Sequence, residues 1–577
     1  MALVGDYDAV KHGTAVTSKH RSAVHPRVRR LGFVAVGVSC MLLTCLEQWR
    51  LLQHLLSRHM NADHALLWLA ARDWSRLTLR EPTFYGQTYG VTFEAIPIAV
   101  LHALGVPYTY ALPLALFLLA WGAWLWLAAS AFRRGMPLAG LTALAAPCLL
   151  SVNHWVVVGV IGTGVGRLLA AACAGLVLRG VSQRARAFTA ITLGGLAVAF
   201  DSASLVLVGP ALVWAAWTWL RMRRFWLPAL LGLLAPAAWV ALNVWFTRVH
   251  PDHDMHANWS LMPERGPLLL NLQEPGRLFA VQSLELLHNG ALIPVALLCL
   301  LGLALCARAW REAAAVSCVI AQLTYLAALE KSLDEIDTLW FPAARMTLGV
   351  PMALWFVAAV TLHACWTRWQ QRQPGWAFAR QLTAPLVSLL VLGSAGVRAL
   401  HWDQHIAAIV QRGQEPKFLE LSRPWEVEAM CAQAQRAARD WGTEIVAFPT
   451  EGTADYACPA LYPELMTVFP SYERRYWILN ELANTAQRRM ILWGRSEKFC
   501  HTGRARELFT ECHSAVPGRA VAVAWENRDP LQVLRGLRYK VRPFGPGCRP
   551  KDTTTCGWWF ARYYPALTHT ALDWRGR

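Results

Sequence analysis

The chain has 577 residues, of which 55% are hydrophobic and 16% are charged, whereas roughly 25% charged residues are usual in soluble domains. Its net charge of +18 would suggest a nucleic-acid partner in a soluble protein. Here the arginines lie mainly in short turns between apolar segments, where they orient membrane proteins instead. The sequence contains no zinc-finger spacing, aromatic–basic RNA signature or Walker loop, so neither nucleic acid nor nucleotide is a predicted partner.

Residues 1–30 form a basic tail in front of the first apolar stretch, 31–46. No small-residue cleavage pattern follows that stretch cleanly, and the basic region is longer than in a cleavable signal peptide. We therefore predict a signal anchor whose basic tail stays in the cytoplasm. The basic residues concerned are Lys11, Lys19, Arg21, Arg27, Arg29 and Arg30.

Residues 31–400 are predicted to form a polytopic α-helical transmembrane domain, because about 20 apolar residues suffice to cross a bilayer. The number of spans depends on two places: segment 156–178 contains Arg167, and only Asp201 and Ser202 divide 187–220. We expect about eleven transmembrane helices, near 31–48, 108–131, 138–153, 156–178, 187–201, 203–220, 225–246, 289–307, 312–329, 346–365 and 383–400.

The turns between these spans carry different charges on the two sides. With the N-terminus inside, arginines fall in the cytoplasmic turns near 133, 184, 223, 308 and 372, and the opposite turns near 154, 202 and 335 are nearly free of them. This is the positive-inside asymmetry, and an odd number of spans places the C-terminus outside. Counting segment 91–106 as a span would reverse that asymmetry. Because Pro97 and Pro107 interrupt and end it, we expect an interfacial or re-entrant helix there.

The first outer loop, residues 49–107, concentrates the polar chemistry of an otherwise apolar region. It contains Asn61-Ala62-Asp63-His64, the run from Phe84 to Gly90 and Phe93-Glu94-Ala95. Polar groups beside a membrane are costly and mark functional sites. Asp63 is a candidate general base because desolvation near the membrane raises the basicity of a carboxylate, and Glu94 is a second candidate carboxylate. The alternative is that both cap helices or pair with nearby arginines of the loop, Arg72, Arg76 or Arg80.

Residues 401–577 differ in composition and are predicted to form a soluble, extracytoplasmic α/β domain. We expect strands at 443–448 and 519–525 and helices at 424–440 and 474–489. Eight of the fourteen cysteines lie in or beside apolar spans, and the even set that remains indicates up to three disulfides in a domain outside the cytoplasm. A zinc site is the alternative, although no C-x2-C pair occurs. The tail cysteines are Cys431, Cys458, Cys500, Cys512, Cys548 and Cys556.

Further candidates follow the loop. Arg345 lies beside a Trp-Phe-Pro turn and would grip phosphate in a bidentate manner, or else anchor the span at the interface. Arg167 would contact a donor or pair structurally, and Lys331 belongs to a mixed-charge outer turn. The sequence implies no certain cofactor and no metal ligands. Binding of a divalent metal remains an alternative. The His/Asp cluster of residues 250–256 is either its candidate site or a solvated turn.

The order Asp63, Ala71-Arg72-Asp73, Phe84-Tyr85-Gly86-Gln87, Tyr89-Gly90 and Glu94-Ala95 resembles the first outer loop of polytopic GT-C-type glycosyltransferases. These include protein O-mannosyltransferases, aminoarabinose–lipid A transferases and their bacterial relatives. Residues 193–224 and 340–345 extend the likeness, which covers about residues 30–400. The resemblance implies a polyprenyl-phosphate sugar as donor, the loop aspartate as base, and a helical membrane module with interfacial helices.

Two residues depart from the pattern of that class. His64 stands where a glutamate is usual, which removes half of an acidic pair that could assist a metal or act as a second acid. Asp201 and Ser202 stand near where relatives carry Thr-Lys, which removes a cation that could meet the donor phosphate. These departures leave the alternative that the protein is a non-catalytic GT-C-like homologue that acts as a transporter or scaffold.

We predict an integral, multi-pass membrane glycosyltransferase, in a bacterial inner membrane with its C-terminal domain in the periplasm. It would transfer a sugar from a polyprenyl phosphate to an extracytoplasmic glycan, lipid or protein, with inversion and with Asp63 as general base. A polysaccharide polymerase or ligase is a related possibility. The predicted catalytic residues are Asp63 and Glu94, and the predicted substrate-binding residues are His64, Tyr85, Gln87, Tyr89, Arg167, Lys331 and Arg345.

Overall fold

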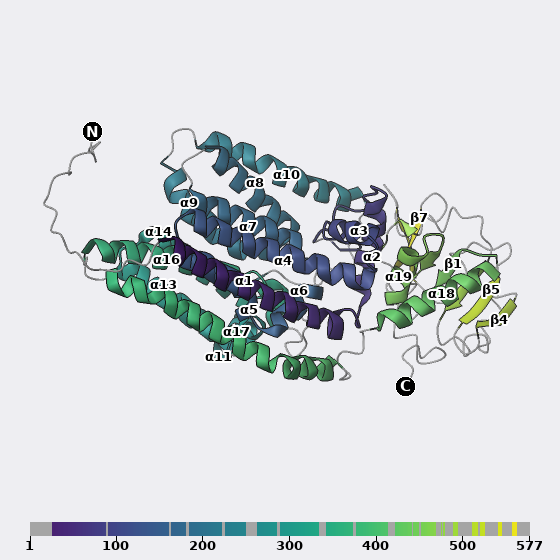
Figure 1. Ribbon diagram of the computed structural model, residues 1–577. Coiled ribbons are helices and arrows are strands. Elements are labelled where there is room, and N and C mark those ends of the chain that lie inside the picture. Colours follow the sequence, from purple (N-terminus) through teal and green to yellow (C-terminus); the bar gives the residue numbers. More distant parts are fainter. Residues whose placement is uncertain are drawn as a thin grey trace.

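A helical bundle makes up most of the chain, and α18, α19 and the strands lie beyond one end of it (Figure 1). The structure is a computed structural model. It describes residues 26–87, 90–160, 163–180, 184–221, 225–249, 262–284, 289–333, 342–372, 377–413, 422–440, 442–448, 452–468, 475, 477–478, 489–493, 511–516, 520–524, 540–544 and 557–561.

The helices of the bundle follow the predicted apolar segments closely. In chain order they are α1 (Pro26–Leu51), which continues as the π-helix η1 (Leu52–Leu56), α2 (Ala62–Ser75), α3 (Ala95–Ala103), α4 (Tyr108–Arg133), α5 (Pro137–Leu149), α6 (Val152–Val160), α7 (Gly164–Arg179), α8 (Arg184–Phe200), η2 (Ser202–Ser204), α9 (Leu205–Trp219) and α10 (Trp226–Val249). After them come α11 (Arg265–Gln273), α12 (Pro275–Leu278), η4 (Ala280–Gln282), α13 (Leu292–Cys306), α14 (Trp310–Ala327), η5 (Glu330–Leu333), α15 (Pro342–Thr347), α16 (Val350–Arg372) and α17 (Ala377–Gly413).

Five helical segments of the described chain are long and apolar enough to cross a membrane: Ala35–Leu56, Tyr108–Arg133, Ser202–Trp219, Trp226–Val249 and Ala344–Trp369. The apolar helices α5 and α13 are shorter. This arrangement fits the predicted polytopic helical class, but the predicted count of eleven spans is not confirmed. The helix that carries the last predicted span, α17, continues past residue 400 to Gly413.

The predicted span 156–178 is not one continuous helix. Val152–Gly159 and Gly164–Arg179 meet at an angle of 115°. Glycine disfavours a helix interior, and at both ends of this break it also permits close packing. A Cβ on Gly159 would lie 2.4 Å from Leu56 Cδ1, and one on Gly164 would lie 2.8 Å from Leu119 Cδ1. The bend presents the N-terminus of α7 to the loop that contains Glu94.

Several indole N–H groups inside the bundle donate hydrogen bonds to groups on other helices, which offsets the cost of burying them in an apolar medium. Trp121 Nε1 donates to Gln48 Oε1 over 2.6 Å, and Trp155 Nε1 donates to the carbonyl of Pro147 over 2.8 Å. Trp355 Nε1 donates to the carbonyl of Ala139 over 3.1 Å. The Trp155 bond joins the consecutive helices α5 and α6, whereas the other two join helices that are 73 and 216 residues apart in the sequence.

The predicted interfacial segment 91–106 contains a helix of nine residues, α3. It ends where the backbone of Gly105 adopts a φ of 90°, a conformation that glycine tolerates and other residues rarely adopt. Pro107 then precedes α4 and is its N-cap residue. The helix itself is therefore confirmed, and its place at the membrane surface stays a prediction.

The chain after α17 forms two helices and two sheets. α18 (Pro424–Asp440) and α19 (Gly452–Leu461) accompany a five-stranded sheet of order β2-β1-β3-β5-β4. β1 is parallel to β2 and β3, and β5 is antiparallel to β3 and β4. β6 and β7 form a separate antiparallel pair. The strands are β1 (Ile445–Ala447), β2 (Met466–Val468), β3 (Arg489–Trp493), β4 (Glu511–Val516), β5 (Ala520–Ala524), β6 (Lys540–Phe544) and β7 (Gly557–Ala561).

The structure confirms the predicted helix 424–440 and the strands predicted at 443–448 and 519–525. Most of the predicted helix 474–489 lies outside the described residues, and Arg489 at its end begins β3 instead.

This C-terminal part packs directly on the first outer loop. Arg72 Nη1, on α2, donates to the carbonyl of Pro459 on α19 over 2.7 Å. Met60 and Ser422 exchange two backbone hydrogen bonds of 2.9 and 2.8 Å. Residues of α2, α3, α4, α18, α19 and β1 share one hydrophobic core. The loop is therefore packed between the bundle and the C-terminal part.

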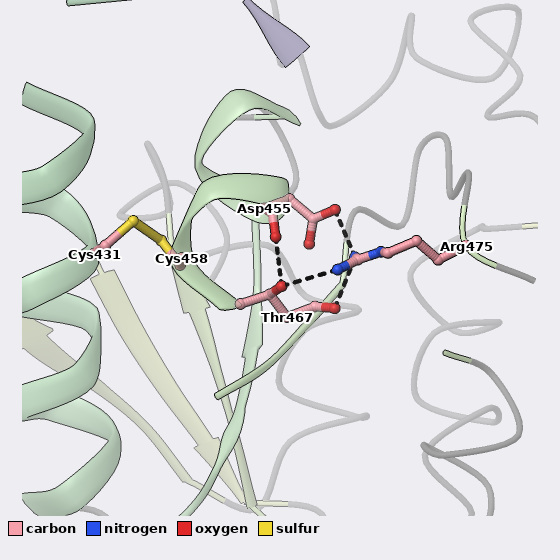
Figure 2. The surroundings of a disulfide bond; sticks show 5 residues. All are labelled: Cys431, Asp455, Cys458, Thr467 and Arg475. Carbon is pink, nitrogen blue, oxygen red and sulfur yellow. Dashed lines mark hydrogen bonds and ion pairs between the residues drawn. A yellow bond between two sulfur atoms is a disulfide. The ribbon is translucent and has the colours of Figure 1, made fainter. Parts of the chain in front are cut away.

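A disulfide joins Cys431 on α18 to Cys458 on α19, with their Cα atoms 5.0 Å apart (Figure 2). One of the three predicted disulfides is thus present. Cys512 lies in β4, and Cys500, Cys548 and Cys556 lie outside the described residues. Since α19 packs on α2, the disulfide holds the helix that covers the loop.

A buried ion pair lies close to this disulfide. Arg475 Nη2 is 2.7 Å from Asp455 Oδ2 and also donates to the Thr467 carbonyl over 2.9 Å (Figure 2). Both charged side chains are at most 2% exposed. Removing one charge would leave the other buried without its counterion, and such a loss typically costs about 3–5 kcal/mol.

We expect Arg475→Met to lower the free energy of unfolding by about 3–5 kcal/mol, measured as a fall in the thermal midpoint of the purified protein. The matched control is Arg439→Met, which breaks an exposed pair with Glu464 (3.4 Å, side chains 70% and 44% exposed) and should cost at most about 1 kcal/mol. Equal shifts in the two variants would contradict a special role of the buried pair.

Candidate functional site

Asp63 and Arg345 meet in the structure, although the sequence suggested them separately. Asp63 lies in the first turn of α2 and Arg345 in α15, and Asp63 Oδ2 is 3.5 Å from Arg345 Nη2. The two side chains are 25% and 31% exposed, so the pair is partly open to solvent. Asp63 therefore contacts an arginine from outside the loop. A carboxylate and a guanidinium so placed can accept a proton and bind an anion side by side.

The N-terminus of α2 is fixed by a capping box in which histidine takes the place of the usual glutamate. The Asn61 side chain accepts from the backbone N–H of His64 over 3.0 Å, and His64 Nδ1 accepts from the backbone N–H of Asn61 over 3.3 Å. These two bonds order the turn that bears Asp63. His64, predicted to bind substrate, thus serves at least to position the neighbouring aspartate.

The position of Arg345 is set by a buried hydrogen-bond chain. Gln282 Nε2 donates to the carbonyl of Ala344 over 3.3 Å and to Thr347 Oγ1 over 3.2 Å. Gln282 Oε1 in turn lies 2.6 Å from His154 Nδ1. His154 and Gln282 are both buried. The short helix α15 is therefore held to the bundle on both sides of Arg345.

Glu94 lies at the head of α3, as predicted, but its side chain caps a different helix. Its Oε1 accepts from the backbone N–H of Val165, at the start of α7, over 3.2 Å, and its Oε2 has no hydrogen-bond partner among the residues that the structure describes. Only 1% of the residue is exposed. Burial is the main reason why the pKa of Glu94 is raised to about 8, so the carboxyl is mainly protonated at neutral pH.

A second group of charges surrounds Glu94. Arg167 is buried and donates from Nε to the carbonyl of Thr163 over 3.2 Å, and within the described ranges its Nη2 has no hydrogen-bond partner. Asp201 lies against Gly166, where a Cβ would come within 2.6 Å of the Asp201 Cβ. Glu94 and Asp201 both interact electrostatically with Arg167, and Asp201 also interacts with Lys331. Lys331 is thus a cation that acts on Asp201, the position at which the resemblance to GT-C-type enzymes implied a missing one.

The two groups of charges are linked through α15. This helix, which bears Arg345, contacts both η2, directly after Asp201, and η5, which contains Lys331. Through α15, the pair of Asp63 and Arg345 is thus connected to the segments that contain Asp201 and Lys331.

Tyr85 belongs to a different part of the loop. It is buried and donates from its hydroxyl to Asp73 Oδ2 over 2.9 Å, and burial together with Asp73 raises its pKa. Asp73 lies ten residues beyond Asp63 on α2, about 15 Å along the helix axis. Trp477 packs edge-on against Tyr85, with ring centroids 5.0 Å apart. Tyr85 therefore ties the loop to the C-terminal part, and a role in substrate binding stays a prediction.

The first glycine of the Phe84–Gly90 run, Gly86, has a clear conformational role. Gly86 adopts a φ of 72° and donates its backbone N–H to Glu81 Oε2 over 3.0 Å. Gln87 is buried, and its backbone N–H donates to the carbonyl of Phe84 over 2.9 Å. Tyr89 lies outside the described residues. The motif thus forms a tight turn around a buried carboxylate.

Sequence reasoning missed three residues that organise the site: Glu81, His154 and Gln282. Glu81 lies just before the glycine motif and could have been found from it. The partners of Gln282 are separated from it by 62 and 65 residues, so no local signal indicated them. The His/Asp cluster of residues 250–256 lies largely outside the described residues, and the described ranges contain no group of three or more metal-ligating side chains.

The raised pKa of Glu94 predicts how the stability of the protein depends on pH. Between pH 4.5 and about 8 folded Glu94 retains a proton that the unfolded chain releases, so the contribution of Glu94 to stability is greatest below pH 4.5 and is lost as the pH rises through this range. We expect Glu94→Gln, which keeps an acceptor for Val165, to remove that slope. The measurement is the thermal midpoint of wild type and variant across the range. Glu426→Gln, at an exposed carboxylate, is the control, and an unchanged slope in Glu94→Gln would contradict the assignment.

No protein-family model matches this sequence, and no curated protein matches it. Among solved structures, the chain is similar to ArnT from Cupriavidus metallidurans bound to undecaprenyl phosphate, with a TM-score of 0.49 and 16% sequence identity. The similarity covers 87% of this chain and 98% of that one. Aminoarabinose transferases are among the proteins that the loop motif resembles.

Proposed function

We propose that this protein is a membrane glycosyltransferase that moves a sugar from a polyprenyl-phosphate donor to an extracytoplasmic acceptor. The observation that carries the proposal is the pair of Asp63 and Arg345, which places a carboxylate 3.5 Å from a guanidinium in a partly exposed position. A transfer from a lipid phosphate needs a base for the acceptor and a cation for the departing phosphate.

In the proposed reaction Asp63 takes the proton of an acceptor hydroxyl while the hydroxyl oxygen attacks the anomeric carbon of the donor sugar. The bond between that carbon and the phosphate oxygen breaks, and its electron pair leaves with the polyprenyl phosphate. Attack opposite the leaving group inverts the configuration. Arg345 turns from Asp63 to the phosphate as negative charge develops there, which also frees the carboxylate to act as a base.

Glu94 has a different role in this proposal. A carboxyl whose pKa is about 8 is mainly protonated at neutral pH, so it donates a hydrogen bond and does not act as the base. Arg167, whose Nη2 is buried without a partner, and Lys331 provide further cations for the donor phosphate. The acid and base roles are thus divided between Glu94 and Asp63 by their surroundings.

The alternative, a non-catalytic transporter or scaffold, predicts that the donor is bound or moved without being cleaved. The test uses purified protein in nanodiscs with radiolabelled undecaprenyl-phosphate sugars and a crude envelope extract as acceptor. Release of undecaprenyl phosphate together with a labelled acceptor supports the transferase. Binding of the donor without release, or movement of intact donor across a vesicle membrane, would replace the proposal by the alternative.

A further inference from the structure

A second polar site lies at the end of the bundle opposite α2 and the strands. A cavity of about 310 Å³ opens there between the C-terminal ends of α4, α9 and α16 and the turn that joins α13 to α14. Figure 1 shows α9, α14 and α16 near this end, far from α2 and α19. The cavity is therefore separate from the site around Asp63.

The lining of this cavity is strongly basic. Four arginines and a single carboxylate, Glu312, face it, which gives a formal charge of +3 with His363 neutral. Tryptophan side chains form part of its wall. The arginines are Arg134, Arg308, Arg311 and Arg368, and the tryptophans are Trp214, Trp217 and Trp310.

Two of the arginines are built into the wall. Arg311 stacks over the Trp214 ring, with Cζ 3.3 Å from the ring centroid, and lies 3.7 Å from Glu312. Trp214 Nε1 donates to Glu312 Oε1 over 3.2 Å. Arg368 donates to the carbonyl of Ala307. These contacts hold the wall of the cavity in place. Because Glu312 already interacts with Arg311 and Trp214, the exposed guanidinium groups of Arg134 and Arg308 have no carboxylate of the lining to balance their charge.

The backbone of Arg308 gives an independent indication of function. It adopts a φ of 56° at the C-terminal end of α13, where glycine is the favoured residue. The turn is closed by hydrogen bonds from Arg308 N to the Leu305 carbonyl (2.8 Å) and from Ala309 N to the Ala304 carbonyl (2.7 Å). Arg308 therefore occupies a conformation that is costly for a residue other than glycine, which indicates that its side chain has a role at this position.

Orientation of a membrane protein requires only that arginines be present in cytoplasmic turns. It does not require that arginines from four separate elements converge on one cavity or stack on tryptophan. We propose that this cavity binds a phosphate-bearing anion, either the headgroup of an anionic phospholipid or a soluble phosphate compound. Guanidinium groups suit phosphate oxygens in geometry and charge, and basic pockets between membrane helices bind anionic headgroups.

The test compares the full-length protein with Arg134→Gln/Arg308→Gly, in which glycine suits the backbone at position 308. The matched control is Arg133→Gln, which removes an exposed arginine next to Arg134 that does not line the cavity. In one arm the proteins are released from nanodiscs of equal phosphatidylcholine and phosphatidylglycerol, and retained lipids are identified by native mass spectrometry. In the other arm inorganic pyrophosphate is titrated into phosphatidylcholine nanodiscs by calorimetry.

Wild type should retain phosphatidylglycerol preferentially if the ligand is a lipid, or bind pyrophosphate if it is soluble. The double variant should bind about 25-fold more weakly, at about fivefold per arginine, and Arg133→Gln should bind as wild type does. Binding of neither ligand, or an equal loss in Arg133→Gln, would overturn the proposal. Circular dichroism of the double variant establishes that it is folded.

Discussion

Replacing Asp63 by asparagine should lower the rate of sugar transfer by about 100- to 10,000-fold, the usual contribution of a general base. Asparagine has the same size and can still accept a hydrogen bond from Arg345, 3.5 Å away in the wild type, but it cannot take the acceptor proton. The measurement is release of undecaprenyl phosphate by wild type and Asp63→Asn in nanodiscs, with donor binding measured in parallel. Binding should change much less than turnover.

The neighbouring position provides the control for that experiment. His64→Glu restores the residue that normally completes a capping box and should leave α2 ordered, because a glutamate side chain can accept from the backbone N–H of Asn61 as His64 Nδ1 does. We expect it to retain most of the activity. Full activity in a folded Asp63→Asn variant would rule out Asp63 as the base and leave the division of roles with Glu94 without support.

Arg345→Gln should lower turnover by about 100- to 1,000-fold, the range seen when one group that stabilises a developing negative charge is removed. The effect should fall mainly on kcat, because charge on the phosphate grows as the bond to the sugar breaks. Arg345→Lys should recover only part of the activity, since an ammonium lacks the planar, two-pronged geometry of a guanidinium. Steady-state kinetics of the three proteins with one lipid-linked donor provides the measurement.

Arg76→Gln is the control, because Arg76 is an exposed arginine at the C-terminal end of the same helix α2. It should have wild-type kinetics. A rise in KM alone for Arg345→Gln would mean that Arg345 binds the donor equally in the ground state and in the transition state. An unchanged kcat and KM would remove Arg345 from the site altogether.

The sequence predicted the local features of the site better than its assembly. Polar residues beside a membrane stand out against apolar neighbours, and therefore Asp63, Glu94 and Arg345 were found one by one. The helix that follows Glu94 was also predictable, from its apolar length and its proline positions. The contact between Asp63 and Arg345 depends on how α2 and α15 pack, and no pattern within either segment indicates the other.

Hydropathy also does not predict where a helix breaks. Segments 138–153 and 156–178 contain enough apolar residues to be predicted as spans, yet α5 ends at Leu149 and α6 and α7 meet at 115°. The bend between α6 and α7 is flanked by glycines that fit against particular leucines, such as Gly159 against Leu56. Hydropathy reports whether a segment prefers lipid to water, and it does not report which side chain fills the space beside a glycine.

The contact between α2 and α19 determines when, during synthesis of the chain, the loop that bears Asp63 can reach its folded packing. Arg72 and the carbonyl that it contacts, that of Pro459, are separated by 387 residues. At about 5–20 residues per second, a ribosome needs roughly 20–80 s to make that length of chain. Throughout this interval the loop that bears Asp63 lacks its contact with α19. That contact can form only after residues up to Pro459 have been made and have folded back onto one of the first segments of the chain.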